Sequence, residues 1–211
     1  MTDLQWMTAA EAARAIAARK LSPVELMNAL LERIGRLDPK LNVFIRLDGD
    51  AAIDAARAAE VEIVSGRSRG PLHGVPVGIK DIIDVARLPT TCHSKVLIDN
   101  VASADAVCVS RLRGAGAIVL GKLSTHEFAI GGPSFDLPWP PARNPWNTDH
   151  HPGGSSSGSG SGLAAGLFPM ALGSDTGGSV RNPASGLRDR GAQADLRPGI
   201  APWCLPTFLH A

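Results

Sequence analysis

The residues from Gly153 to Ser179 constrain the fold more than any other part of this sequence. Two segments rich in glycine and serine enclose an apolar segment from Leu163 to Leu172. Glycine lets the backbone approach other groups closely and adopt conformations that are closed to other residues. A flexible linker would have no apolar segment to bury, so the pattern predicts two loops beside a buried helix or strand. Serines in such loops become nucleophiles only where a base lies near them.

Composition is that of an ordinary soluble protein. The 211 residues can form one large domain or two small ones with a substantial core. A formal charge of +1 gives no electrostatic reason to expect binding to nucleic acid or to a membrane. No apolar run approaches the roughly 20 residues that span a bilayer, and no secretory signal pattern begins the chain. Three cysteines show no metal-type spacing. We expect a cytoplasmic protein without a metal or another cofactor.

The first 64 residues predict a helical segment that packs on the core. Thr8 and Glu11 form a capping-box pattern, and Ser22 followed by Pro23 is typical of a second helix start. The expected elements are helices over residues 8–20, 22–37 and 50–59 and a strand over residues 41–47. The apolar stripe of the second helix has the helical period, which favours burial in the core over a partner surface.

The composition changes at Ser65, after which the pattern becomes that of an α/β protein. Residues 75–84 predict a buried strand that carries one lysine, Lys80. Burying an ammonium group is costly, so Lys80 either pairs with Asp81 or Asp84 or serves as a base. For an isolated lysine, pairing is the more common arrangement. A helix over residues 106–112, a glycine turn and a strand over residues 117–120 follow, in the order typical of α/β folds.

Several other kinds of site fit the sequence poorly. The glycine-rich stretch lacks the P-loop pattern, and Gly114 and Gly116 follow a predicted helix, whereas a dinucleotide fingerprint follows a strand. His126, His150 and His151 have no further ligand spaced to complete a metal site, so solvent-facing or loop-bonding roles are favoured for them. A Ser-His-Asp triad would need a strand directly before its serine, but the residues before Ser155 predict a loop.

Lys80, Ser155 and Ser179 together predict a nucleophilic site. A serine needs a nearby base, and a lysine whose pKa is lowered by burial can supply one. The turn from Asp175 to Ser179 carries successive backbone N–H groups that could converge on one oxygen, as an oxyanion hole requires.

Several strings resemble those of the amidase signature family, which includes amidases and the A-type subunits of glutamyl-tRNA amidotransferases. They are H-G-V-P-V-G-I-K-D, G-K-L-S-T-H-E-F-A-I-G-G-P-S, N-P-W-N, G-G-S-S-S-G and A-L-G-S-D-T-G-G-S-V-R-N-P-A, in this order between about Leu21 and Ser185. The resemblance implies an α/β fold with a mixed central sheet covered by helices on both faces. Residues 65–185 would then be part of the family core, with its C-terminal part missing.

The resemblance also implies roles for particular residues. Ser179 would attack an amide carbonyl, and Ser155, preceded by a cis peptide bond, would relay a proton between Ser179 and Lys80. Ser156 and Asp175 would support this triad. The backbone N–H groups of the oxyanion hole would be those of Thr176, Gly177, Gly178 and Ser179. One departure is Ser157, where many family members carry glycine.

As for partners, the resemblance implies a small-molecule amide substrate and no binding of nucleic acid or membrane by this chain. A homodimer, or the partner subunits of an amidotransferase, are the protein partners that it leaves open. Three functions compete: an amidase, the glutaminase-type subunit of a tRNA-dependent amidotransferase, and a non-catalytic remnant.

After Ser185 the sequence departs from the family. One choice of codons from Gly186 onward, read from its second base, encodes A-C-G-I-V-G-L-K-P-T-Y, which resembles the expected continuation. We therefore predict a single-base frameshift near Ser185. Residues 186–211 would be an out-of-frame, disordered tail, and the truncated chain would be unstable with little or no amidase activity.

Overall fold

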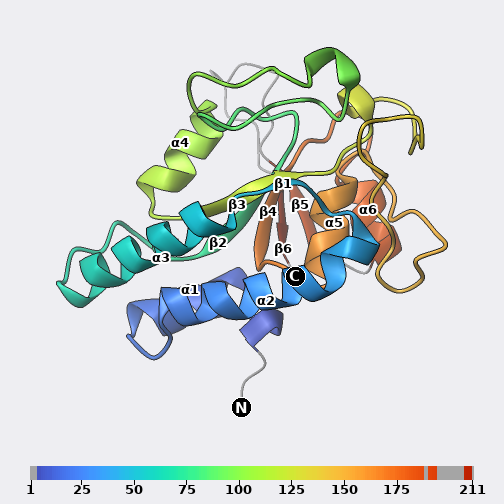
Figure 1. The fold of residues 1–211 in the computed structure, drawn as a ribbon. Helices are drawn as coiled ribbons and strands as arrows, with labels where there is room; N and C mark the ends of the chain where they lie inside the picture. Colours follow the sequence, from blue (N-terminus) through green and yellow to red (C-terminus); the bar gives the residue numbers. More distant parts are fainter. Residues whose placement is uncertain (1–3, 188–189, 194–206, 211) are drawn as a thin grey trace.

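A six-stranded mixed sheet forms the centre of the fold (Figure 1). The structure, a computed structural model, describes residues 4–187, 190–193 and 207–210. The strands are β1 (Phe44–Leu47), β2 (Pro76–Lys80), β3 (Ile118–Leu123), β4 (Met170–Gly173), β5 (Arg190–Gln193) and β6 (Thr207–His210), in the spatial order β1-β3-β2-β4-β6-β5. β2 pairs in parallel with β3 and β4, and the other pairs are antiparallel. The predicted mixed α/β architecture is confirmed.

Helices cover both faces of this sheet. They are α1 (Ala9–Ala17), α2 (Pro23–Leu41), α3 (Gly49–Val64), α4 (Val107–Gly114), α5 (Ser157–Ala164) and α6 (Arg181–Leu187), with short 3-10 helices at Leu4–Trp6, Lys95–Leu97 and Glu127–Ala129. Alternate residues of a strand point to opposite faces. Accordingly, Val77 and Ile79 pack in one apolar cluster with α1 and α4, whereas Ile118 and Leu120 pack in the other with α3 and α5. None of the helices in the described ranges is long and apolar enough to cross a membrane.

The N-terminal helices begin as the sequence predicts. Thr8 and Glu11 form both bonds of the capping box, and the hydroxyl of Ser22 accepts two N–H groups at the start of α2. The predicted end of α2 before Pro39 is wrong, because the helix continues to Leu41. The carboxylate of Asp38 accepts the N–H of Val43 at 2.7 Å, and the side chain of Leu41 is buried. These two contacts stabilise the last helical turn beyond Pro39.

The prediction that the first glycine- and serine-rich segment is a loop is also wrong. Most of it forms α5, which is buried along its whole length. A Cβ at Gly158 would lie 2.7 Å from the carbonyl oxygen of Val43, so glycine permits contact with neighbouring backbone. The hydroxyl of Ser159 donates to the carbonyl of Leu172 and that of Ser161 to the carbonyl of Arg143. The Leu163–Leu172 segment then leads from the end of α5 into β4.

Two parts of the tail predicted to be disordered are strands. β6 pairs with β4 and with β5, both antiparallel, so these two segments extend the sheet. The remaining tail residues 188–189, 194–206 and 211 lie outside the described residues. The frameshift itself remains a prediction, as does the division of the chain at residues 64 and 185.

Candidate active site

Lys80 ends β2 and is completely buried. Its Nζ lies 2.8 Å from the hydroxyl oxygen of Ser155, 3.0 Å from that of Ser156 and 2.8 Å from that of Ser174. Neither Asp81 nor Asp84 pairs with Lys80 among the residues that the structure describes. The structure therefore brings the predicted base to the serine cluster, and the alternative of a simple strand-end ion pair does not hold.

Burial lowers the pKa of Lys80 from 10.5 to about 7, although the charges of Asp175 and Cys92 partly oppose this effect. A neutral amine has two N–H donors and one lone pair. With three hydroxyls in reach, it can donate to two of them and accept a proton from the third. At neutral pH the lysine is thus able to act as a base towards Ser155.

Ser155 follows a cis peptide bond, as the family resemblance implies, and lies shortly before the start of α5. The carbonyl of Ser155 accepts the N–H of His126 at 3.2 Å, and the N–H of Gly154 donates to the side chain of Asn182 at 3.0 Å. The ring of His126 packs directly against Gly154, where an added Cβ would lie 2.3 Å from Nε2. The imidazole and the asparagine therefore fix the peptide that carries Ser155.

Gly154→Ala should disturb this peptide, because the ring of His126 fills the space that the methyl group would need. We expect a loss of about 1–3 kcal/mol in the free energy of unfolding, typical of overpacking, measured by urea denaturation. Gly177→Ala is the matched control, since nothing lies within 4 Å of a Cβ there. If adding His126→Ala restores the stability of Gly154→Ala, the clash with the ring is the cause of the loss. Equal stability of Gly154→Ala and Gly177→Ala would contradict this explanation.

Ser179 lies in a turn that Asp175 organises. The carboxylate of Asp175 accepts the N–H groups of Gly178, Val180 and Arg181 and pairs with the guanidinium of Arg181. These contacts, led by the bond from the side chain of Arg181, hold the pKa of Asp175 well below its usual range. The carbonyl of Ser179 accepts the N–H of Ser156 at 3.0 Å, which ties the turn to the segment that carries Ser155.

The predicted oxyanion donors are only partly available. The N–H of Gly178 donates to Asp175 at 2.7 Å and is already used. Within the described chain, the N–H groups of Thr176, Gly177 and Ser179 have no backbone or side-chain acceptor. The hydroxyl of Ser179 likewise forms no hydrogen bond with Ser155 there. Among the described residues, three of the four predicted N–H groups therefore remain without an acceptor, and their role as an oxyanion hole stays a prediction.

An open cavity of about 580 Å³ joins these parts. Its lining includes Ser155, His126, Asn182 and the whole turn from Thr176 to Ser179. Ile130, which is 75% exposed, adds an apolar rim. No lysine, arginine, aspartate or glutamate is among the described residues that line the cavity. The cavity thus offers two serines and backbone donors to an uncharged group.

Sequence reasoning missed Ser174 and the packing of His126 against Gly154. Ser174 stands directly before Asp175, and its place beside the glycine-rich turn is the only local sign of its contact with Lys80. For His126 the sequence favoured a solvent-facing or loop-bonding role over metal binding, but it did not predict that the ring packs against Gly154. Its Nδ1 lies 3.2 Å from the carbonyl oxygen of Gly131, and burial lowers its pKa. The described residues contain no cluster of metal-ligating side chains.

A second buried lysine, Lys122, stands on the neighbouring strand β3. Its Nζ lies 2.8 Å from Oδ1 of Asp81 and donates to the hydroxyl of Thr90 and to the carbonyl of Pro89. The other oxygen of Asp81 accepts the N–H and the hydroxyl of Thr91. Lys122 is in register with Ile79, so it points to the opposite face from Lys80. The pair joins β2 and β3 to the loop that follows β2.

Lys122→Met should be strongly destabilising, because it leaves the buried carboxylate of Asp81 without its counter-charge. Breaking a buried pair in this way typically costs about 3–5 kcal/mol. The double variant Asp81→Asn with Lys122→Met should recover much of that loss, as measured by the free energy of unfolding in urea. A double variant as unstable as the sum of its single changes would show that the two groups are not coupled.

Comparison with known proteins places this geometry in a family. The sequence profile of the amidase family matches residues 25–187. The chain is 44% identical over 185 residues to the A-type subunit of the glutamyl-tRNA(Gln) amidotransferase from Acidothermus cellulolyticus, a match that covers 88% of this chain. It spans 37% of that relative's length. The family match ends two residues after Ser185, where the sequence is predicted to leave the family.

Solved structures show the same likeness. A peptide amidase from Stenotrophomonas maltophilia is 38% identical, with a TM-score of 0.77 over 84% of this chain and 38% of its own. A bacterial aryl acylamidase of the amidase signature family is 27% identical, with a TM-score of 0.85 over 97% of this chain and 45% of its own. The profile match covers most of the chain, and the chain belongs to the amidase signature family.

Proposed function

We propose that this chain carries the catalytic triad of an amide hydrolase, with Ser179 as nucleophile, Ser155 as proton relay and Lys80 as base. The observation that carries the proposal is the contact of 2.8 Å between Nζ of a fully buried lysine and the hydroxyl of Ser155. Burial sets the pKa of this lysine to about 7, where it can accept a proton at neutral pH.

In the proposed reaction, Ser179 attacks the carbonyl carbon of an amide while its proton passes to Ser155 and the proton of Ser155 passes to Lys80. The N–H groups of Thr176, Gly177 and Ser179 stabilise the oxyanion. When the C–N bond breaks, the proton returns through Ser155 to the leaving nitrogen, and ammonia or an amine departs. Water then attacks the ester on Ser179 and releases the carboxylic acid.

Covalent labelling tests the nucleophile directly. A small aryl fluorophosphonate should attach to Ser179, with loss of fluoride, and peptide mass spectrometry should find the adduct on the turn from Thr176 to Arg181. Lys80→Met should slow the labelling by about 10²-fold or more, since the general base is removed. An adduct on Ser155 or Ser156 in place of Ser179, or equal labelling of the Lys80 variant, would refute the assigned roles.

A second candidate function is that of a glutaminase-type amidotransferase component, which relatives 43–50% identical to this chain favour by their names. Glutamine carries an ammonium and a carboxylate, and burying either unpaired is costly. The described cavity lining has no acidic residue, lysine or arginine to pair with them. We therefore favour an uncharged amide. Release of ammonia from glutamine at a rate equal to that from a simple neutral amide would reverse this choice.

We also propose that hydrolysis by this chain is weak or absent. The family match ends at residue 187, so the part of the family sequence expected to follow and to cover the site is not matched in this chain. Hydrolysis of a neutral aryl amide by the purified chain can be followed by release of the aromatic amine. Rapid turnover that Ser179→Ala removes would overturn the expected weakness while supporting the triad.

A further inference from the structure

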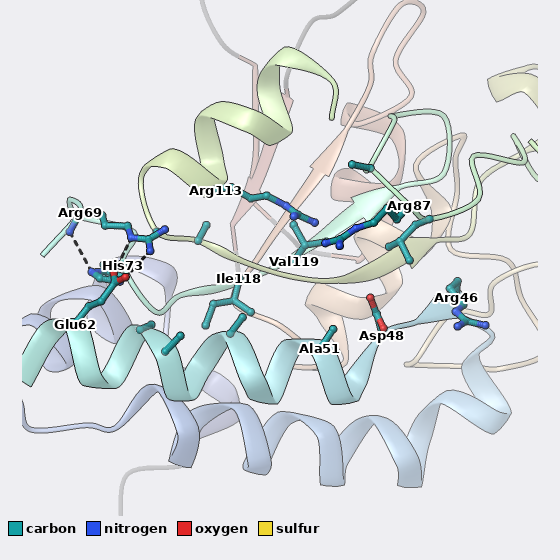
Figure 2. A pocket seen from close by; sticks show the side chains of 17 residues that line it. Arg46, Asp48, Ala51, Glu62, Arg69, His73, Arg87, Arg113, Ile118 and Val119 are labelled. Carbon is teal, nitrogen blue, oxygen red and sulfur yellow. Dashed lines mark hydrogen bonds and ion pairs between the residues drawn. The ribbon is translucent and has the colours of Figure 1, made fainter. Parts of the chain in front are cut away.

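A second cavity, of about 640 Å³, is lined by residues of α3, α4, β3 and the loop after β2. Figure 2 shows it between α3 and α4, with β3 along its back. None of Lys80, Ser155 and Ser179 lines it. This cavity is separate from the proposed amidase site.

The edge of β3 is only half covered by β1. The register of β1 on β3 spans Gly121–Leu123, and the N–H of Asp48 adds a bond to the carbonyl of Leu120. Ile118 donates its N–H to Val75 on the β2 side at 2.9 Å. Val119, the next residue, lines the cavity, and the register of β1 does not reach it. Val119 is in register with Val77 of β2, but in the described part of the chain no strand pairs with it on the β1 side.

Four arginines line the same cavity, and two of them have no partner among the described residues. Arg69 forms two bonds with Glu62, and Nε of Arg113 lies 3.4 Å from the carboxylate of Asp105. The guanidinium groups of Arg46 and Arg87 make no hydrogen bond or ion pair with any described residue. Besides Glu62, the lining contains one acidic residue, Asp48. The side chains that line the cavity therefore carry a net positive charge.

The arginines converge from different elements. Arg46 comes from β1, Arg87 from the loop after β2 and Arg113 from the end of α4, and Figure 2 shows the side chains of Arg87 and Arg113 reaching towards each other over β3. Like charges held close together are unfavourable unless an anion lies between them. On the opposite wall, α3 presents small alanines to the cavity, among them Ala51 and Ala55. Because alanine side chains are short, this wall leaves room for an extended peptide along β3.

We propose that this cavity binds an extended acidic peptide of a partner protein. The peptide pairs its backbone with the N–H and C=O of Val119 as an added edge strand. Its carboxylates bind Arg46, Arg87 and Arg113, which form charge-assisted hydrogen bonds. The open strand edge supplies pairing for a backbone, and the unpartnered guanidiniums select acidic side chains, so both features fit one ligand.

Fluorescence anisotropy with labelled hexapeptides tests this site in the full chain. A peptide of alternating valine and glutamate should bind, whereas its valine-lysine counterpart and a version with proline in place of the central valine should not. Arg87→Ala and Arg46→Ala should each weaken binding about tenfold, the loss expected for one charge-assisted bond. Arg111→Ala is the matched control, because Arg111 lies on α4 with Arg113 but does not line the cavity.

Circular dichroism should show that all variants fold as the unchanged chain does, so that weakened binding reports the site. Equal binding of the proline peptide would overturn strand pairing, and equal binding by Arg87→Ala and Arg111→Ala would overturn the arginine contacts. Free glutamate that competes as well as the peptide would reduce the cavity to a small-anion site and overturn the proposal. Absence of any peptide binding would also refute it. Because triad variants should bind the peptide normally, these outcomes are distinct from failure of the proposed amidase function.

Discussion

Ser179→Ala is expected to abolish whatever amide hydrolysis this chain performs, together with labelling by a fluorophosphonate. The hydroxyl of Ser179 is the proposed atom that bonds to the carbonyl carbon, and the neighbouring serines cannot replace it. Ser155 and Ser156 are held at 2.8 and 3.0 Å from the amine of Lys80. Removing a nucleophile of this kind typically costs about 10³-fold or more in rate. The measurement is the initial rate of amine release from a neutral aryl amide.

Ser185→Ala is a matched control for this experiment. Ser185 is exposed on α6, and its hydroxyl donates to the carbonyl of Asn182 within the same helix. It should leave both the rate and the labelling unchanged. Circular dichroism and urea unfolding should show that Ser179→Ala folds like the parent, since the Ser179 hydroxyl has no hydrogen bond in the described chain. Residual labelling of Ser179→Ala at the parent rate would mean that another serine is the nucleophile.

Lys80→Met should remove both the activity and a pH dependence of stability. The pKa of Lys80 lies near 7 in the folded chain and near 10.5 when exposed. Below about pH 7 the lysine is charged in both states, and the folded chain bears the full cost of burying the charge. Between about pH 7 and 10.5 the folded chain has lost the proton that the unfolded chain keeps, so stability rises with pH.

The size of this effect follows from the same pKa values. Each tenfold difference in proton affinity corresponds to about 1.4 kcal/mol, so the rise from pH 7 to 10.5 should reach about 4–5 kcal/mol. Urea unfolding of the parent chain and of Lys80→Met across this range measures it, and the contribution of Lys122 cancels in the difference. Parallel curves for the two proteins would show that Lys80 keeps an ordinary pKa.

Activity should have its own pH dependence with the same origin. The proposed base is the neutral amine, so labelling of Ser179 should increase with pH and level off above about pH 7.

Asp175 raises the pKa of Lys80 through its negative charge. Asp175→Asn should therefore move the midpoint to lower pH, while also loosening the turn that the carboxylate holds. A midpoint that stays in place would show that Asp175 has no influence on the base.

Much of the fold could be predicted from local patterns. The caps at Thr8 and Ser22, the buried strand before Lys80 and the helix, glycine turn and strand at residues 106–120 depend on residues that are neighbours in sequence. The errors arose where distant contacts decide the structure. A run of glycine and serine looks like a loop, but it forms the buried helix α5, in which neighbouring backbone at Gly158 and the ring of Phe168 at Gly162 leave no room for larger side chains.

For the site, local sequence was enough to identify the residue types: a lysine in an apolar strand and serines framed by glycine, in strings shared with a family. The surroundings of these residues depend on contacts between parts of the chain that are distant in sequence. In the folded chain Asp81 pairs with Lys122 on the other face of the sheet and not with Lys80. Ser174 lies within hydrogen-bond distance of Lys80. In the folded chain the N–H of Gly178 donates to the carboxylate of Asp175, which removes one of the four predicted oxyanion donors. The pairing of donors with acceptors depends on strand register and on burial. Neither can be predicted from one short segment of the sequence.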